Sequence, residues 1–174
     1  MKRVLPLLVA AALAAPAGAQ ETPPLPGHFT PPAQPGAPVG VVVSVDVGGG
    51  GLIGGGTQYT PSGLFEGEVG VGYELPLGLR PELGLVLGLA PRTHFALRPG
   101  VHYELPDLPL YARGALDWST LRGSGGWRWL LVGGGGALRV TDVLGAFAEA
   151  DVGLPLAAAT GLGVLLRVGV TFRL

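Results

Sequence analysis

Apolar and polar residues alternate with a period of two along most of the chain from residue 39 onward. In Gly161–Leu174 the even positions carry large apolar side chains, whereas the odd positions are mostly glycine, arginine or threonine. Because successive side chains of a β-strand point to opposite faces, this pattern predicts a strand with one apolar and one small or polar face. The same alternation predicts eight strands, at residues 39–48, 63–75, 79–89, 94–105, 108–118, 127–140, 143–152 and 161–174.

An internal repeat supports this division into strands. The sequence GVGYELP at Gly70–Pro76 returns as GVHYELP at Gly100–Pro106, an offset of 30 residues. That offset corresponds to one hairpin with its turns, so the repeat indicates a regular succession of antiparallel strands.

The sixth strand departs from the alternation. Trp127, Trp129 and Leu131 fit one phase, whereas Leu138 and Val140 fit the other. We expect a β-bulge within residues 133–136, a run of four glycines, to reconcile the two phases.

The first 38 residues lack the strand pattern and resemble an export signal followed by a linker. Basic Lys2 and Arg3, an uncharged apolar run and an A-x-A cleavage site ending at Ala19 predict a secretory signal peptide over residues 1–19. A transmembrane anchor is the alternative, but the apolar run is well short of the ~20 residues that a span needs. Residues 20–38 hold seven prolines and predict a semi-rigid periplasmic linker, with a proline-rich ligand for a groove as the alternative.

The alternation alone fits either a membrane barrel or a soluble β-sandwich. Two features favour the barrel. The polar face carries as many glycines and alanines as charges, which suits a narrow interior. The aromatic residues of the apolar face fall into two bands, as in the girdles of outer-membrane barrels. The bands are Phe65, Phe95, Trp118 and Trp127 at the outer strand ends, and Tyr73, Tyr103 and Phe172 at the periplasmic ends.

Composition narrows the class of protein further. The 174 residues include 32 Gly, 17 Pro and no Cys, and the formal net charge is -1. The mean hydropathy is +0.47. These values exclude a wholly disordered chain, a disulfide or zinc scaffold and a basic nucleic-acid-binding protein. We therefore expect an all-β fold, an up-and-down antiparallel transmembrane β-barrel of eight strands over residues 39–174.

The signal sequence, the eight alternating strands, the aromatic bands and the C-terminal Val168–Leu174 resemble the small OmpA/OmpX-type outer-membrane β-barrels. The resemblance covers residues 39–174. It implies a monomer in the outer membrane of a Gram-negative bacterium, with outer-membrane lipids and the barrel-assembly machinery as partners. In that family the last strand typically ends in an aromatic residue that the machinery reads. Here the chain ends in Leu174, with Phe172 two residues earlier on the same face, and these two residues are the expected assembly signal.

The second face of the strands would line the lumen and carries most of the charged residues. Eight strands leave an interior that side chains nearly fill, so charges there should pair. We therefore expect a mostly filled lumen and a structural or interaction role. The alternative is a narrow conduit for small solutes or apolar ligands. The expected lumen charges are Asp46, Glu66, Glu68, Glu74, Arg80, Glu82, Arg98, Glu104, Arg113, Asp117, Glu149, Asp151 and Arg167, with Arg139, Arg173, His94 and His102 on the same face.

Candidate catalytic groups are sparse. His94 and His102 share a face but lie about 26 Å apart along a strand, too far to chelate one metal ion. His102 and Glu104 could form half of a metal site, although a hydrogen bond in the lumen is the simpler explanation. Some eight-stranded barrels modify lipid A with a serine and a histidine, but the sequence has no His-x-Ser motif of that kind. A lipid-modifying enzyme is thus the least favoured hypothesis, and we expect no catalytic residue, cofactor or metal ion.

The glycine runs at residues 48–51, 54–56 and 133–136 lack the Lys-Ser/Thr ending of a phosphate-binding loop. We expect them in flexible loops, including an outer loop at residues 49–62, or at close contacts between strands.

Overall fold

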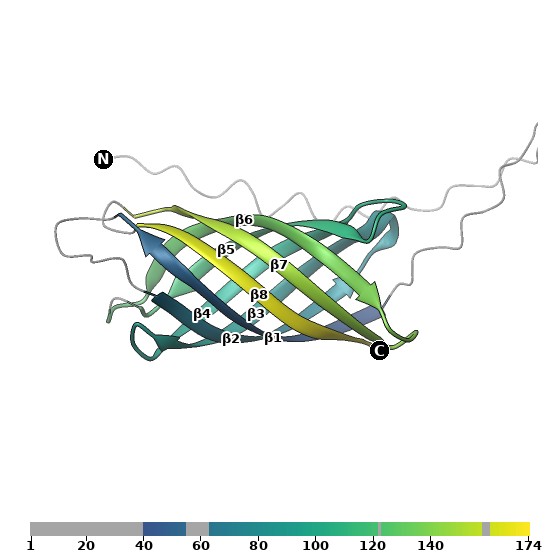
Figure 1. The fold of residues 1–174 in the computed structure, drawn as a ribbon, viewed down its shortest axis with the longest axis horizontal. Coiled ribbons are helices and arrows are strands. Elements are labelled where there is room, and N and C mark those ends of the chain that lie inside the picture. The colour runs from purple at the N-terminus through teal and green to yellow at the C-terminus, as the bar shows by residue number, and fades with distance from the viewer. Residues whose placement is uncertain (1–39, 55–62, 122, 158–160) are drawn as a thin grey trace, which may run out of the picture. The chain divides into compact units, whose positions relative to one another are not determined.

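The computed structural model describes residues 40–54, 63–121, 123–157 and 161–174. The predicted signal peptide (1–19) and linker (20–38) lie outside the described residues. Eight antiparallel strands form one closed barrel, in which each strand pairs with its sequence neighbours and β8 pairs with β1 (Figure 1). The elements are β1 (Gly40–Ile53), β2 (Gly63–Glu74), the 3₁₀ turn η2 (Pro76–Gly78), β3 (Leu79–Ala90), β4 (His94–Glu104), β5 (Leu110–Ser119), β6 (Gly126–Arg139), β7 (Leu144–Pro155) and β8 (Leu162–Arg173).

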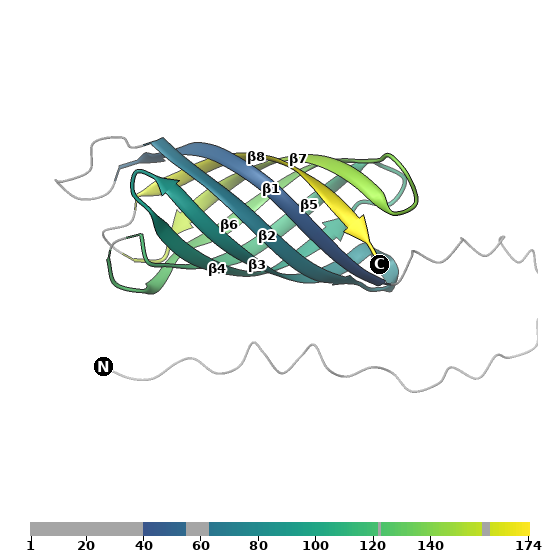
Figure 2. The same cartoon turned by 90° about the horizontal axis from the view of Figure 1, so that it is seen from below.

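The eight-stranded all-β prediction is confirmed. The β1–β8 pairing runs from Val42–Arg173 to Ile53–Leu162, so the sheet has no open edge along this seam. Closure matters in hydrocarbon, because each unpaired backbone group there costs several kcal/mol. All strands tilt in the same sense around the barrel (Figure 2). Within the described ranges, no helix has the length and apolar character to cross a membrane.

The two ends of the barrel differ in their connections. At one end, here named the turn end, short turns join β2 to β3, β4 to β5 and β6 to β7, and β1 begins and β8 ends there. At the other, the loop end, lie the connections of residues 54–62, 91–93, 120–125 and 156–161. In outer-membrane barrels the short turns face the periplasm and the longer loops face outward.

Side-chain exposure separates the two faces of the sheet as the alternation predicts. On β3, Leu85 is 58% exposed on the outside, whereas the neighbouring Val86 is 3% exposed and points inward. The whole barrel exposes a belt of valine and leucine while it buries charged side chains. A soluble protein shows the reverse distribution. The surface therefore suits a hydrocarbon environment.

β1 is longer than predicted, because the glycine run that we assigned to a loop belongs to the strand. Gly49–Gly51 pair with both β2 and β8, and the β8 pairing continues to Ile53. Glycine has low β-propensity and shows no side-chain alternation, so the sequence pattern ends early there. Gly48 also makes room in the lumen, since a Cβ atom at this position would lie 2.6 Å from Cγ of Arg167. β7 likewise extends three residues beyond its predicted end, to Pro155.

The predicted bulge at residues 133–136 is wrong. These glycines pair in continuous register with both β5 and β7. The irregularity lies at Arg128, between the pairs Asp117–Trp129 and Trp118–Trp127. The extra residue keeps Trp127 on the outer face but turns Trp129 and Leu131 inward, where both are buried. The prediction that Trp127, Trp129 and Leu131 lie on the same face of the strand is therefore wrong as well.

Candidate functional site in the barrel interior

Three arginines in the middle of the lumen bind most of its carboxylates. Arg98, from β4, donates from Nε to Asp117 at 2.8 Å. Its terminal nitrogens donate to both oxygens of Glu66 and, at 3.0 Å, to Glu68. All four side chains are buried. Every hydrogen-bonding nitrogen of this guanidinium thus has a carboxylate partner, the geometry in which Arg–carboxylate bonds are strongest.

Arg113, from β5, binds three further carboxylates. It donates to Glu82 at 2.5 Å, to Glu68 at 3.1 Å and to Glu149 at 3.2 Å. Its partners come from β2, β3 and β7, so this one side chain links distant strands across the lumen.

Arg167, from β8, completes the network. It lies 2.7 Å from both Glu68 and Glu149, and it also donates to Asp151. Glu68 is therefore shared by all three arginines. We call the three arginines and the six carboxylates that they bind the central network. The six carboxylates are Glu66, Glu68, Glu82, Asp117, Glu149 and Asp151.

Apolar side chains fill the loop half of the lumen. Trp129 and Leu131 lie at the centre of this apolar cluster, and Nε1 of Trp129 donates to the carbonyl of Gly161 at 2.8 Å. Sequence reasoning missed the cluster, because the bulge at Arg128 hid the inward direction of both residues. The members of the cluster are Leu52, Leu64, Ala115, Leu121, Trp129, Leu131 and Leu165.

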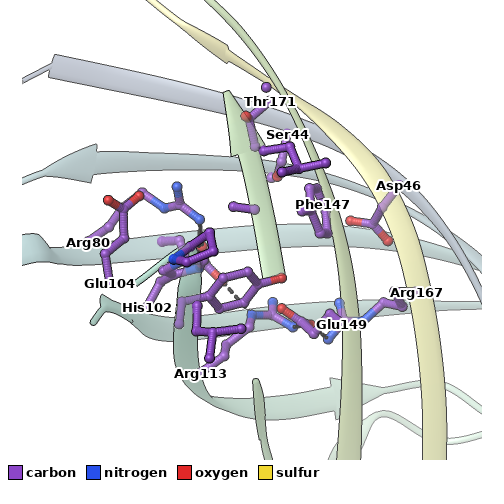
Figure 3. Close-up of a pocket in the computed structure, with 18 of the residues that line it drawn as sticks. Ser44, Asp46, Arg80, His102, Glu104, Arg113, Phe147, Glu149, Arg167 and Thr171 are labelled. Atoms are coloured by element: carbon purple, nitrogen blue, oxygen red, sulfur yellow. Dashed lines mark hydrogen bonds and ion pairs between the residues drawn. The ribbon is translucent and has the colours of Figure 1, made fainter. Parts of the chain in front are cut away.

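The turn half of the lumen holds a cavity of about 160 Å³. That volume accommodates on the order of ten water molecules. Glu68, Arg113 and Arg167 of the central network line it, and the exposed Leu138 and Arg139 line it near the turn end. We call it the turn-end cavity; its lining side chains are shown in Figure 3.

A stacked histidine lies beside this cavity. Nδ1 of His102 lies 2.7 Å from a terminal nitrogen of Arg80 and forms a hydrogen bond with it. The imidazole stacks on the Tyr111 ring, with centroids 3.9 Å apart and an interplanar angle of 24°. The histidine that we considered as half of a metal site is thus held by an arginine and an aromatic ring.

The structure places all thirteen predicted lumen charges on the inner face of the barrel. Nine of them make up the central network. At the turn end, Arg173 contacts Glu74 at 3.1 Å and Glu104 at 3.3 Å. Glu104 is the most exposed of the set. The side chain of Asp46 takes part in no hydrogen bond or ion pair with another described residue.

The aromatic residues assigned to the two bands face outward. The side chains of Phe65, Tyr73, Phe95, Tyr103, Trp127 and Phe172 are exposed, and Trp118 pairs with Trp127 on the same face. Leu174, at the chain end, is also exposed. Three other aromatic residues, Tyr111, Trp129 and Phe147, turn inward and belong to the lumen.

The histidine nearest the loop end has no catalytic partner in the described part of the barrel. Nδ1 of His94 forms a hydrogen bond with the carbonyl of Arg92 at 2.9 Å. Ser119, also buried, accepts a bond from the backbone of Leu121 at 3.1 Å. Among the described residues there is no serine–histidine hydrogen bond, and no three His, Asp or Glu side chains are arranged to hold a metal ion.

The closed sheet, its apolar exterior and its charged interior define the class of eight-stranded transmembrane β-barrels. Neisserial surface protein A has this fold, with 16% identity, a TM-score of 0.56 and coverage of 77% of this chain and 97% of that one. The N-terminal barrel domain of Pseudomonas aeruginosa OprF matches at 17% identity and a TM-score of 0.54, over 79% of this chain and 100% of that one.

A designed transmembrane β-barrel matches as well, at 16% identity and a TM-score of 0.54, over 80% of this chain and 99% of the designed one. No protein-family model and no curated protein sequence matches this chain. The predicted resemblance to small outer-membrane barrels is thus confirmed at the level of the fold.

Proposed function

We propose that the protein is a closed barrel of the Gram-negative outer membrane with a structural or interaction role. The observation that carries this proposal is the filled lumen. The central network crosses its middle and the apolar cluster lies in its loop half, so buried side chains obstruct the lumen between the described strands. A solute would have to break several buried ion pairs to pass, each at a cost of several kcal/mol.

The same proposal covers the remaining parts of the chain. Residues 1–19 direct export and are removed, and residues 20–38 form a periplasmic spacer before the barrel. The barrel is monomeric and contacts outer-membrane lipids through its apolar belt. It has no catalytic residue in this proposal, which is supported by the arginines that engage the lumen carboxylates other than Asp46.

Single-channel recording in planar lipid bilayers tests the closed lumen against the narrow conduit. We expect the reconstituted barrel to produce no stepwise conductance above the bilayer baseline in about 1 M salt. At this concentration even weak channels conduct measurably, and the Debye length is only about 3 Å. A porin reconstituted in parallel shows that insertion was detectable. Reproducible cation-selective steps would support the conduit instead.

The C-terminal strand carries the proposed assembly signal. Phe172 lies on the outer face of β8 and Leu174 follows its last residue, where an assembly factor could read them before the barrel enters the membrane. Phe172 also lies opposite Val43 of β1 at the seam that closes the barrel.

We expect Phe172→Asp to reduce the amount of protein in the outer membrane and to increase its degradation by periplasmic proteases. A charge on the lipid face near an interface costs only about 0–1 kcal/mol, so a large loss would point to the signal rather than to stability. Immunoblots of membrane fractions measure the effect, with the inward-facing Thr171→Ser as the control. Normal outer-membrane levels of the Phe172 variant would argue against the signal.

A further inference from the structure

Asp46 is a buried carboxylate whose side chain forms no ion pair or hydrogen bond with a described residue. It projects from β1 into the turn-end cavity and is 7% exposed, and its Oδ1 atom has no hydrogen-bond partner among the described residues. In Figure 3 it lies across the cavity from Arg80 and Glu104. Arg113 and Arg167 line the same cavity but pair with other carboxylates, so a charged Asp46 without an ion pair of its own is unfavourable there unless it binds a proton or a cation.

A glycine, Gly169, forms part of the wall around Asp46. Gly169 of β8 lies directly opposite both Asp46 of β1 and Phe147 of β7. A Cβ atom at Gly169 would lie 2.6 Å from Cβ of Asp46 and 2.7 Å from Cε1 of Phe147. The glycine therefore brings a carboxylate and an aromatic ring to the same part of the cavity.

Two hydroxyl groups lie one row nearer the turn end. Ser44 and Thr171 are paired across the β1–β8 seam, and both line the cavity. On their other sides, Ser44 pairs with Gly70 of β2 and Thr171 pairs with Gly145 of β7, and neither glycine adds a side chain. The hydroxyl oxygens of Ser44 and Thr171 lie over these two glycines and can accept hydrogen bonds.

The interior as a whole carries a negative formal charge, whereas the side chains that line the cavity balance, with five carboxylates against five arginines. The inner face of the described barrel carries nine carboxylates and six arginines, a formal charge of −3 with neutral histidines. They are Asp46, Glu66, Glu68, Glu74, Glu82, Glu104, Asp117, Glu149 and Asp151, against Arg80, Arg98, Arg113, Arg139, Arg167 and Arg173.

We propose that the turn-end cavity binds a small organic ammonium ion that enters from the turn end. The ammonium group pairs with Asp46 and donates to the hydroxyls of Ser44 and Thr171, and the ring of Phe147 covers its apolar part. Aromatic rings stabilise such cations when they are desolvated. The described residues offer no group of three His, Asp or Glu side chains for a metal ion, which favours the organic cation. This site goes beyond the proposed structural role and does not require conductance.

NMR titration of the isotope-labelled full-length mature protein in detergent micelles tests the proposal, with methylammonium chloride as the probe. We expect saturable shift changes at Asp46, Ser44, Phe147 and Thr171 that sodium chloride at equal ionic strength does not produce. Asp46→Asn should weaken the affinity about tenfold or more, because a charge-assisted contact is lost. The matched control is Asp142→Asn, an equal change of charge at an exposed turn position, which should bind as the wild type does.

Phe147→Leu provides a second variant that keeps the carboxylate, and it should weaken binding several-fold while the barrel stays folded. Either variant with reduced affinity supports the site. The proposal is overturned if the wild type shows no saturable change, if both folded variants bind methylammonium as the wild type does, or if sodium or calcium ions produce the same shifts.

Discussion

Replacing Arg98 by methionine is expected to lower the free energy of unfolding by about 3–5 kcal/mol. Arg98 is buried, and it holds Glu66, Glu68 and Asp117. Methionine fills similar space but leaves Glu66 and Asp117 without any arginine partner in the described structure. Urea unfolding in lipid vesicles, followed by tryptophan fluorescence, measures the loss.

The control for this prediction is Arg139→Met. Arg139 lies exposed near the turn end and forms no ion pair with a described residue, so its replacement should change stability by less than about 0.5 kcal/mol. A triple variant that adds Glu66→Gln and Asp117→Asn to Arg98→Met should recover part of the lost stability, because it removes the two buried carboxylate charges that have no arginine partner. Equal stability of the Arg98 and Arg139 variants would contradict the central network as a stabilising element.

Replacing Leu85 by arginine is expected to cost about 2–4 kcal/mol of stability in a bilayer. Leu85 lies in the middle of β3 and faces outward, where the structure has an apolar belt. A guanidinium at this depth must leave water or distort the bilayer around it. Reversible unfolding from phospholipid vesicles gives the free energy.

Leu77→Arg is the matched control, because it makes the same exchange in the turn η2 outside the strands. Leu77 is 82% exposed, and it already holds a positive φ of 74° as a non-glycine residue. We expect little change there. Similar costs at positions 77 and 85 would indicate that the belt does not contact hydrocarbon.

The period-two pattern predicted most of the fold because each face of the sheet has a uniform environment. Once the apolar phase of β3 is placed outside, Arg80 and Glu82 must face inward, and the structure places them there. The same rule located the carboxylates of the central network, but not their partners. Which arginine meets Glu68 depends on side-chain reach across several strands, and alternation carries no information about that.

The failures have local physical causes. A single extra residue at Arg128 reverses the phase of β6, and no residue type marks it in the sequence. The position of the turn-end cavity depends on side-chain volume around the whole barrel. Trp129 and Leu131 are buried in the loop half, whereas Gly70, Gly84 and Gly145 line the cavity in the turn half. Such volumes can be compared only after the register of all strands is known.

We infer that the apolar face of this barrel contacts lipid and that the lumen excludes it. Trp127 and Trp129 test it directly, since they are two residues apart but face opposite sides of the sheet, with 49% and 5% exposure. Variants that keep only one of them, with the other tryptophans replaced by phenylalanine, are reconstituted in vesicles whose lipids carry bromine on the acyl chains. We predict strong quenching of Trp127 fluorescence and little quenching of Trp129. Equal quenching of the two, or no quenching of Trp127, would contradict the account.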